Sequence, residues 1–428
     1  MESRKLSKIL SSNKNTIYGK RYSFCDIKSI ACFQKKVPIS TYEDYISYIN
    51  KIKNGEQNIL TSEKVLLLEP SSGSTSAKKL IPYTKGLKYE FSSAISTWLW
   101  DLNKNFPRLK YGQIYFSITP QATVNEGIVG FNGDDEYIGG LLGRLISRKF
   151  CVPNGVKNIV NIEEFWHVTI EYIKSAKNLR LVSVWNPTFL LIMLEKAKMT
   201  SKELFPNLEV ISCWADGNSA PLAKKLQDVF PDVYIQPKGL LATEGIMTIP
   251  IEGIGKRLTE SHFFEFVDKN GDVRLTHELS VGEEYEILLT TSGGLYRYNI
   301  GDIVRYNGNC CFDFISKSGN VSDYFGEKLN ETHVRGIISG DGFRILVPNG
   351  NKYTLYSEID VNIDKIDMAL RENFHYDYCR KLGQLERVAF MKIQNGEQQY
   401  IDNCLRMGMR LGDIKPMYLS NKEGWIFK

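Results

Sequence analysis

The sequence predicts a mixed α/β fold with one large N-terminal domain and a smaller C-terminal one. The chain has 428 residues, about two to three times the usual size of a domain. Between residues 113 and 251, short apolar runs alternate with stretches of helical periodicity, which is typical of α/β sheets. From Ser261, strand-like runs follow one another without a helix, so a β-rich, barrel-like subdomain is expected at about 261–316.

The boundary between the domains is expected at the polar, glycine-bearing stretch 317–320, which interrupts the pattern of strands. We therefore place an N-terminal domain at residues 1–316 and a mobile α+β C-terminal domain at 317–428. The stretch 317–320 would be the hinge between them.

The individual elements follow from periodicity and from turn residues. The first sixty residues are predicted to be helical, with Ser40–Glu43 as a capping arrangement. A buried strand is expected at Lys64–Glu69 and a helix at Thr84–Leu102, so a strand, a loop and a helix would follow one another. Further strands are expected at 113–119, 181–184, 210–213, 233–236, 246–251, 263–267, 284–291 and 303–306, and further helices at 189–198 and 219–229.

Composition excludes several classes of protein. Hydrophobic residues make up 43% and charged residues 24% of the chain, as in ordinary globular proteins. The net charge of +5 is too small for a nucleic-acid-binding surface, and the apolar run 181–194 is too short for a membrane helix. The polar start Met1–Lys5 lacks the apolar core of a signal peptide, and eight cysteines show no metal-binding spacing. We expect a cytoplasmic protein without a nucleic-acid or membrane partner.

The loop Ser71–Lys79 is the first candidate for chemistry. Its five hydroxyls, one glycine and two lysines suit the binding of phosphate oxygens. The loop lacks the second glycine and the Lys-Ser/Thr ending of the P-loop nucleotide hydrolases. From composition alone, a flexible linker is an equally good interpretation.

Two further motifs follow downstream. In Lys238–Gly245, a hydroxyl stands next to a carboxylate, Thr243-Glu244, which suits Mg²⁺ and a phosphate, although such a pair is more often a solvated turn. In Tyr296–Asp302, the aspartate Asp302 follows a glycine and could accept hydrogen bonds from a ribose diol; alternatively the Gly-Asp pair is only a turn.

These three motifs, in this order, resemble the adenylate-forming superfamily of acyl-CoA synthetases, luciferases and adenylation domains. A narrower set resembles the acyl-acid amido synthetases, the plant auxin- and jasmonate-conjugating enzymes and their bacterial relatives. The narrower set comprises Glu69–Thr75 with Lys79–Pro82, Cys213–Asp216, Lys238–Gly245, Tyr296–Tyr298 with Gly301-Asp302, and Phe325–Leu329. The resemblance covers most of the chain, from about residue 60, and implies a large adenylate-forming domain with a small mobile C-terminal domain.

The resemblance also implies residue roles around the nucleotide. ATP and Mg²⁺ are the implied cofactors, with Glu244 on the metal, Thr243 on a phosphate and Asp302 on the ribose hydroxyls. The residues implied to hold the phosphates are Ser71, Ser72, Gly73, Ser74, Thr75 and Lys79. The residues implied to line the nucleotide pocket are Trp214, Ala215 and Asp216.

Four other positions take implied roles. Trp185 and Asn186 would lie beside the acyl substrate, and Lys415 is the candidate for the mobile catalytic lysine. Lys317 stands where the superfamily usually has a ribose-binding arginine, and it keeps the charge but not the planar fork. Ala242-Thr243-Glu244 replaces the plant Ser-Ser-Glu pattern, a feature of the bacterial branch, so plant hormone specificity is not implied.

The implied activity is activation of a carboxylic acid as an acyl-adenylate, followed by transfer to an amine, an amino acid in this family. One alternative is transfer to the thiol of coenzyme A or of a carrier protein. The other is a catalytically inactive protein that binds nucleotide or acyl ligand as a sensor or scaffold. Glu244, Lys79 and Lys415 are the predicted catalytic residues.

Overall fold

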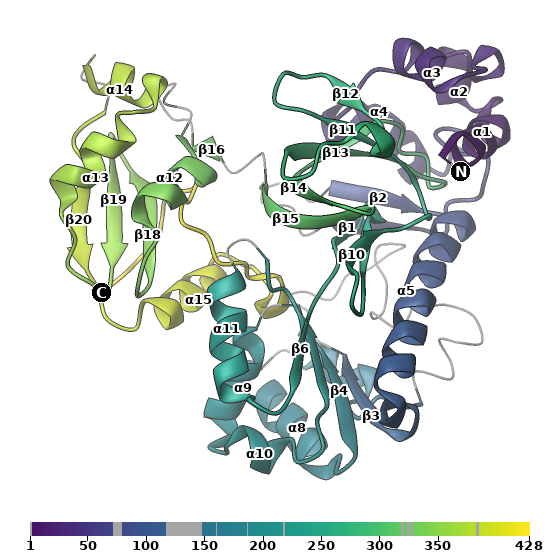
Figure 1. The fold of residues 1–428 in the computed structure, drawn as a ribbon. Helices are drawn as coiled ribbons and strands as arrows, with labels where there is room; N and C mark the ends of the chain where they lie inside the picture. The colour runs from purple at the N-terminus through teal and green to yellow at the C-terminus, as the bar shows by residue number, and fades with distance from the viewer. Residues whose placement is uncertain are drawn as a thin grey trace. The chain divides into compact units, whose positions relative to one another are not determined.

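The structure is a computed structural model that describes residues 2–71, 79–116, 148–159, 161–185, 187–216, 219–317, 321–322, 327, 329–381 and 385–428. The chain divides into two compact units (Figure 1). The first contains the residues up to Asp216 together with Ala220–Ile315, and the second begins at Ser316. Across the described part of the chain, no helix combines the length and apolar character needed to cross a bilayer.

Four helices form the start of the first unit, as the sequence predicts. They are α1 (Glu2–Asn13), α2 (Ile17–Arg21), α3 (Ile30–Lys36) and α4 (Tyr42–Lys53). Helix α4 begins after Thr41, whose backbone N–H donates to the Asp44 carboxylate at 2.8 Å. This contact satisfies an N–H that the first turn leaves without a helical partner.

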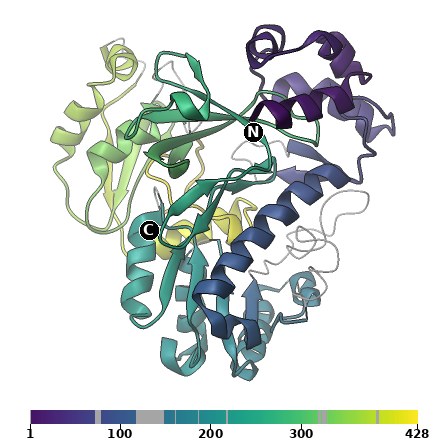
Figure 2. The ribbon, with the colours of Figure 1, turned by 45° about the vertical axis from the view of Figure 1, so that its right-hand side comes forward.

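A β-hairpin follows the helices and corrects one prediction. Strand β1 (Leu67–Ser71) pairs antiparallel with β2 (Lys79–Tyr83), and helix α5 (Lys85–Asn105) begins only after β2. The predicted order of strand, loop and helix therefore omitted a strand. Lys79–Tyr83 contains Pro82 and was hidden by its short length. The long helix α5 then crosses from this hairpin to the parallel sheet (Figure 2).

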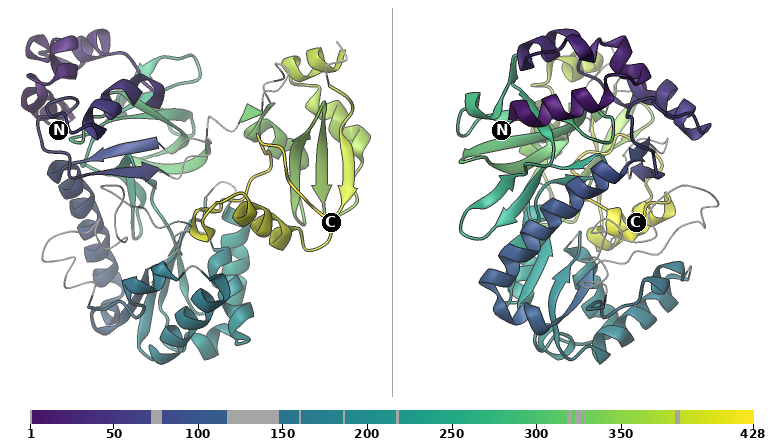
Figure 3. Two further views of the ribbon diagram at one scale, coloured as in Figure 1. Left: turned by 180° about the vertical axis from the view of Figure 1, so that it is seen from behind. Right: turned by 90° about the vertical axis from the view of Figure 1, so that its right-hand side faces the viewer.

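Alternating strands and helices form a four-stranded parallel sheet in the order β3-β4-β5-β6. The strands are β3 (Gln113–Phe116), β4 (Leu179–Ser183), β5 (Val210–Cys213) and β6 (Tyr234–Pro237). The helices that accompany them are α8 (Ile162–Ser175), α9 (Thr188–Ala197), α10 (Ser201–Leu204) and α11 (Ala220–Val229) (Figure 3). This arrangement confirms the predicted α/β pattern, and it brings the ends of β4 and β5 together.

The predicted β-rich region forms an antiparallel sheet of seven strands rather than a closed barrel, with β12 and β9 at its two edges. In sheet order the strands are β12 (Val273–Arg274), β11 (Phe263–Val267), β13 (Glu284–Thr290), β14 (Tyr298–Gly308), β15 (Cys311–Lys317), β10 (Gly255–Leu258) and β9 (Thr248–Ile251). The sheet also includes β9 and β10, which precede Ser261, the predicted start of the β-rich region. A short hairpin, β7 (Leu241–Ala242) and β8 (Gly245–Ile246), lies just before β9.

Aromatic packing and a buried ion pair join the N-terminal helices to β14. Tyr18 stacks on Tyr45 at 5.7 Å and on Tyr296 at 4.9 Å between ring centroids. Arg297, only 4% exposed, lies 3.0 Å from the Glu265 carboxylate and donates to the Gln34 and Val37 carbonyls at 2.8 Å each. The Arg297 guanidinium therefore pairs in the interior and not at the surface.

The second unit has a three-stranded sheet in the order β18-β19-β20. Its strands are β18 (Arg344–Asn349), β19 (Lys352–Ser357) and β20 (Ala389–Lys392), preceded by the short pair β16 (Val321–Ser322) and β17 (Leu329–Asn330). Its helices are α12 (Glu331–Ile338), α13 (Ile363–Leu370), α14 (Phe374–Lys381) and α15 (Gly396–Arg406). The α+β character predicted for this part of the chain agrees with these elements.

Replacing Arg297 by methionine should lower the free energy of unfolding by about 3 kcal/mol, because Glu265 is left as an unpaired buried charge. The measurement is urea denaturation followed by circular dichroism. Arg274→Met is the matched control, since Arg274 is 41% exposed and pairs with Asp268 on the surface. That variant should lose less than about 1 kcal/mol, and equal losses would contradict the prediction.

Candidate active site

The stem of the hydroxyl-rich loop is held by helix α4. Ser71 and Lys79 are paired across the β1–β2 ladder, so the loop connects the ends of two adjacent strands. The Leu80 N–H donates to the Tyr42 hydroxyl at 2.8 Å, and the Lys79 ammonium lies 5.7 Å from the centre of the same ring. Tyr42 was missed by sequence reasoning, because nothing in its local pattern distinguishes it from a core aromatic residue.

The tip of that loop lies outside the described residues, and so do four of the predicted phosphate ligands, Ser72, Gly73, Ser74 and Thr75. The described chain resumes at Lys79 in a strand, β2, and not in a helix. The phosphate-binding role of the loop stays a prediction.

The second motif is the two-residue tip of the β7–β8 hairpin. Ala242 pairs with Gly245, which leaves Thr243 and Glu244 at the turn. The Tyr83 hydroxyl, on a side chain only 1% exposed, donates to the Thr243 carbonyl at 2.8 Å. Since Tyr83 ends β2, this hydrogen bond ties the hairpin that carries the first motif to the hairpin that carries the second.

The third motif lies close enough for Glu244 to act on it. Burial raises the pKa of Tyr298, and the negative charges of Glu244 and Glu43 raise it further. Tyr298 is the first residue of β14, so the start of this strand lies within electrostatic range of the acidic tip. The three motifs, far apart in the sequence, therefore meet within the first unit.

A bulge in β14 presents Asp302. The register of β13 and β14 shifts between Glu286 and Leu288, and Gly301 adopts φ 72°, a conformation that a side chain would strain. The Gly301 N–H donates to the Asn299 side chain at 2.7 Å. Asp302 itself is 2% exposed in this structure, and its contact with ribose stays a prediction.

Two tryptophans meet at the carboxyl ends of β4 and β5. The Trp214 N–H donates to the Trp185 carbonyl at 2.8 Å, and the two rings lie 5.7 Å apart. The Lys238 ammonium lies 5.0 Å from the Trp185 ring and donates to the Ser183 hydroxyl at 2.6 Å. The structure thus brings the predicted acyl-side Trp185 next to the predicted nucleotide-side Trp214, while Asn186 lies outside the described residues.

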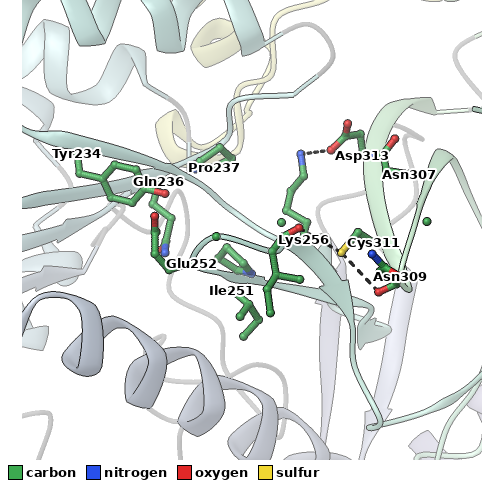
Figure 4. A pocket seen from close by; sticks show the side chains of 15 residues that line it. Tyr234, Gln236, Pro237, Ile251, Glu252, Lys256, Asn307, Asn309, Cys311 and Asp313 are labelled. Atoms are coloured by element: carbon green, nitrogen blue, oxygen red, sulfur yellow. Dashed lines mark hydrogen bonds and ion pairs between the residues drawn. The ribbon is translucent and has the colours of Figure 1, made fainter.

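Asp216 is engaged by a lysine that the sequence did not suggest. The Lys256 ammonium pairs with the Asp216 carboxylate and lies 2.7 Å from Asp313 on β15, toward which it points in Figure 4. Burial raises the pKa of Asp216 despite this pairing, whereas for Asp313 the pairing overcomes burial and lowers the pKa. Lys256 and Asp313, but not Asp216, border a cavity of about 420 Å³ that Tyr234 and Gln236 also line. The three charged residues together hold the loop after β5, with Ala215, in place.

In the second unit, the backbone around Lys415 is anchored while its side chain is exposed. The Tyr400 hydroxyl donates to the Lys415 carbonyl, and the Tyr400 ring stacks on Trp425 at 5.2 Å. The Tyr418 N–H donates to the Glu331 carboxylate at 2.7 Å. Lys317 is the last residue of β15, and its side chain lies outside the described part of the structure.

The residues present suit a magnesium ion that is shared with a phosphate ligand. Within the described ranges, no three His, Cys, Asp or Glu side chains lie close enough together to hold a metal ion. Mg²⁺, however, typically takes one or two protein carboxylates and completes its shell with water and substrate phosphates. A single carboxylate on an accessible hairpin tip, as at Glu244, is compatible with that donor set.

Two models of one family match this chain. The GH3 family N-terminal domain matches residues 1–198, and the GH3 family central domain matches residues 257–316. The chain belongs to the GH3 family. The family predicted from the motifs is therefore confirmed.

Plant enzymes are among the relatives of this GH3 chain. It is 26% identical to jasmonoyl–L-amino acid synthetase JAR4 of Nicotiana attenuata, over 71% of this chain and 66% of the relative. It is 23% identical to indole-3-acetic acid-amido synthetase GH3.4 of Arabidopsis thaliana, over 82% of this chain and 73% of the relative. These relatives give no support to the placement in a bacterial branch, which had been suggested by Ala242-Thr243-Glu244.

Solved structures confirm the adenylate-forming fold. The GH3.15 acyl acid amido synthetase in complex with 2,4-DB superposes with a TM-score of 0.80 at 17% identity, covering 99% of this chain and 91% of that one. A 2-hydroxyisobutyryl-CoA ligase in the postadenylation state gives 0.57 at 10% identity, over 91% and 84% of the two chains. The fold is thus shared by enzymes with different acyl acceptors.

Replacing Tyr83 by phenylalanine should raise the KM for ATP by about fivefold to tenfold, because the Thr243 carbonyl loses its hydrogen bond and the hairpin tip moves. The measurement is the ATP dependence of pyrophosphate exchange with an accepted acid. Tyr285→Phe is the matched control, because Tyr285 accepts from the Ser280 N–H at 2.9 Å and ties down another part of the fold. An unchanged KM in the Tyr83 variant would argue against this coupling of the two hairpins.

Proposed function

We propose that this GH3 protein is an acyl acid amido synthetase. It uses ATP and Mg²⁺ to convert a carboxylic acid into an acyl-adenylate and pyrophosphate, and it then transfers the acyl group to an amine, releasing AMP. The amine is proposed to be an amino acid, as in the names of the jasmonate- and auxin-conjugating relatives. The observation that supports the proposal is the convergence of three motifs, two of which are joined by the Tyr83–Thr243 hydrogen bond.

The first half-reaction overcomes the low reactivity of a carboxylate toward nucleophiles. A carboxylate is a poor electrophile, because its oxygen is a poor leaving group at neutral pH. Attack of one carboxylate oxygen on the α-phosphorus of ATP forms a P–O bond and expels pyrophosphate, which turns that oxygen into part of a good leaving group. The hydroxyls of Ser71–Thr75 and the Lys79 ammonium would bind the phosphates and stabilise their charge.

Other residues would position the nucleotide. Glu244 would hold Mg²⁺, which supplies charge neutralisation on the phosphates when bound. Thr243 would contact a phosphate, and Asp302 would accept from the ribose hydroxyls, with Lys317 as a further ribose contact. Trp214, Ala215 and Asp216 would line the nucleotide pocket, and Trp185 and Asn186 would lie beside the acyl group. Binding energy from ATP would thus be used to orient the reacting atoms.

The second half-reaction forms the amide. The amine nitrogen attacks the adenylate carbonyl, the C–O bond to AMP breaks, and the nitrogen loses a proton. Lys415, in the second unit, would stabilise the α-phosphate in the first step, and a swing at residues 317–320 would then admit the amine. The hinge, the domain boundary, Lys415 and a cytoplasmic location stay predictions.

A screen of carboxylic acids for ATP–pyrophosphate exchange tests the first half-reaction, and a screen of amines on the best acid tests the second. We expect exchange that depends on one class of acid, and AMP release that depends on an added amino acid. AMP release that depends on coenzyme A and not on amines would show that the product is a thioester and not an amide. No exchange with any acid in a broad panel would favour the inactive sensor or scaffold.

Replacing Lys415 by alanine should lower the rate of pyrophosphate exchange about 100-fold, while ATP still binds, because stabilisation of developing charge at the α-phosphate is lost. Exchange kinetics and calorimetric binding of ATP give the two readouts. Lys422→Ala is the matched control, since Lys422 is an exposed lysine in the same C-terminal segment. Equal rates in the two variants would remove Lys415 from the mechanism.

A further inference from the structure

A chain of buried polar groups lies behind the β7–β8 hairpin. The Ile246 N–H, two residues after Glu244, donates to His262 Nε2 at 3.0 Å. On the other side of the ring, His262 Nδ1 lies 3.1 Å from Glu90 Oε2, and Glu90 Oε1 lies 2.7 Å from the Lys5 ammonium. The chain therefore connects α1, α5, the residue before β11 and strand β8, four elements that are distant in the sequence.

The contacts determine where the proton of the imidazole resides. Because Nε2 accepts a hydrogen bond from a backbone N–H, it carries no proton, so the ring is neutral and its proton is on Nδ1, toward Glu90. Glu90 is 3% exposed, and its Oε1 atom is paired with the Lys5 ammonium. Ser292 also donates to the Glu90 carboxylate, at 2.5 Å from its hydroxyl and 3.3 Å from its backbone N–H. The Glu90 carboxylate therefore lies beside His262 Nδ1, on the side of the ring away from Ile246.

The glycine after Glu244 is required by the same contact. A Cβ atom on Gly245 would lie 2.8 Å from His262 Nε2, which is closer than real Cβ contacts allow. The Phe91 and Phe264 rings lie 6.4 and 5.8 Å from the imidazole at steep angles and restrict its orientation. The imidazole and the hairpin therefore fit together only with glycine at position 245.

We propose that His262 is a positioning residue for the acidic hairpin tip, held in its turn by Glu90 and Lys5. The hairpin is held on both sides of Glu244, by Tyr83 at the Thr243 carbonyl and by His262 at the Ile246 N–H. A two-residue turn has little freedom when the residues that flank it are fixed, so Glu244 is presented in one place. The consequence for catalysis rests on the proposed function, in which Glu244 holds Mg²⁺ with ATP.

The test compares three variants with a matched control. His262→Leu removes the acceptor, His262→Gln keeps an amide oxygen within reach of the Ile246 N–H, and Lys5→Met disturbs only the partly exposed far end of the chain, where misfolding is not expected. Thr290→Val is the control. Thr290 is a buried residue of β13 in the seven-stranded sheet, and its hydroxyl accepts from the Arg297 backbone N–H at 2.9 Å.

The first readout is hydrogen–deuterium exchange of a peptide that covers residues 243–247, which needs no substrate. We expect exchange about tenfold faster in His262→Leu, a smaller increase in Lys5→Met, near-native exchange in His262→Gln, and no change in this peptide in Thr290→Val. Unchanged exchange in His262→Leu would overturn the inference. This readout stands even if the native protein activates no acid, an outcome that would defeat the proposed function alone.

The second readout is the Mg²⁺ concentration that gives half-maximal pyrophosphate exchange. It should rise about tenfold in His262→Leu and return toward the native value in His262→Gln, whereas Thr290→Val should leave it unchanged. A uniform fall in rate with an unchanged Mg²⁺ requirement would show a structural role only, and would overturn the assignment of His262 as a positioning residue.

Discussion

The hydrogen bond from the Tyr83 hydroxyl to the Thr243 carbonyl is the contact on which the candidate site depends. It joins two hairpins whose tips carry the hydroxyl-rich loop and the Thr243-Glu244 pair, and it does so from a buried side chain that water cannot displace. A donor in the last residue of β2 thereby couples the β1–β2 hairpin to the acidic tip. His262 accepts from the Ile246 N–H of the second hairpin, and Tyr298 at the start of β14 lies within electrostatic range of Glu244.

Ion pairs connect segments that are distant in the sequence. Arg297, just before β14, connects that strand to Glu265 on β11 and to the carbonyls at the end of α3, and Lys256 on β10 contacts the loop after β5 and β15. A buried charge without its partner is costly, so such pairs resist rearrangement even where their net contribution to stability is small. Two of these ion pairs, Arg297–Glu265 and Lys256–Asp216, connect elements that are not neighbouring strands of one sheet, whereas Lys256–Asp313 links the paired strands β10 and β15.

The fold and the family carry different information about the reaction. The adenylate-forming fold is shared with a coenzyme A ligase, so the fold supports adenylation and leaves the acceptor open. Membership of the GH3 family favours an amine, and the names of the plant relatives favour an amino acid. The acyl site is predicted around the ends of β4 and β5, where Trp185 and Trp214 meet.

The sequence by itself determined the α/β class, the family and most strands, because short-range periodicity and local motifs are written into neighbouring residues; β5 and β11 lie where they were expected. Only the tertiary structure decided which motifs meet and what holds them. Tyr42, Tyr83, Lys256 and His262 act across separations of 16 to 160 residues, and no local pattern distinguishes them from core or surface residues. Strand β2 was missed, and the barrel became an open sheet, because pairing partners are chosen by long-range packing.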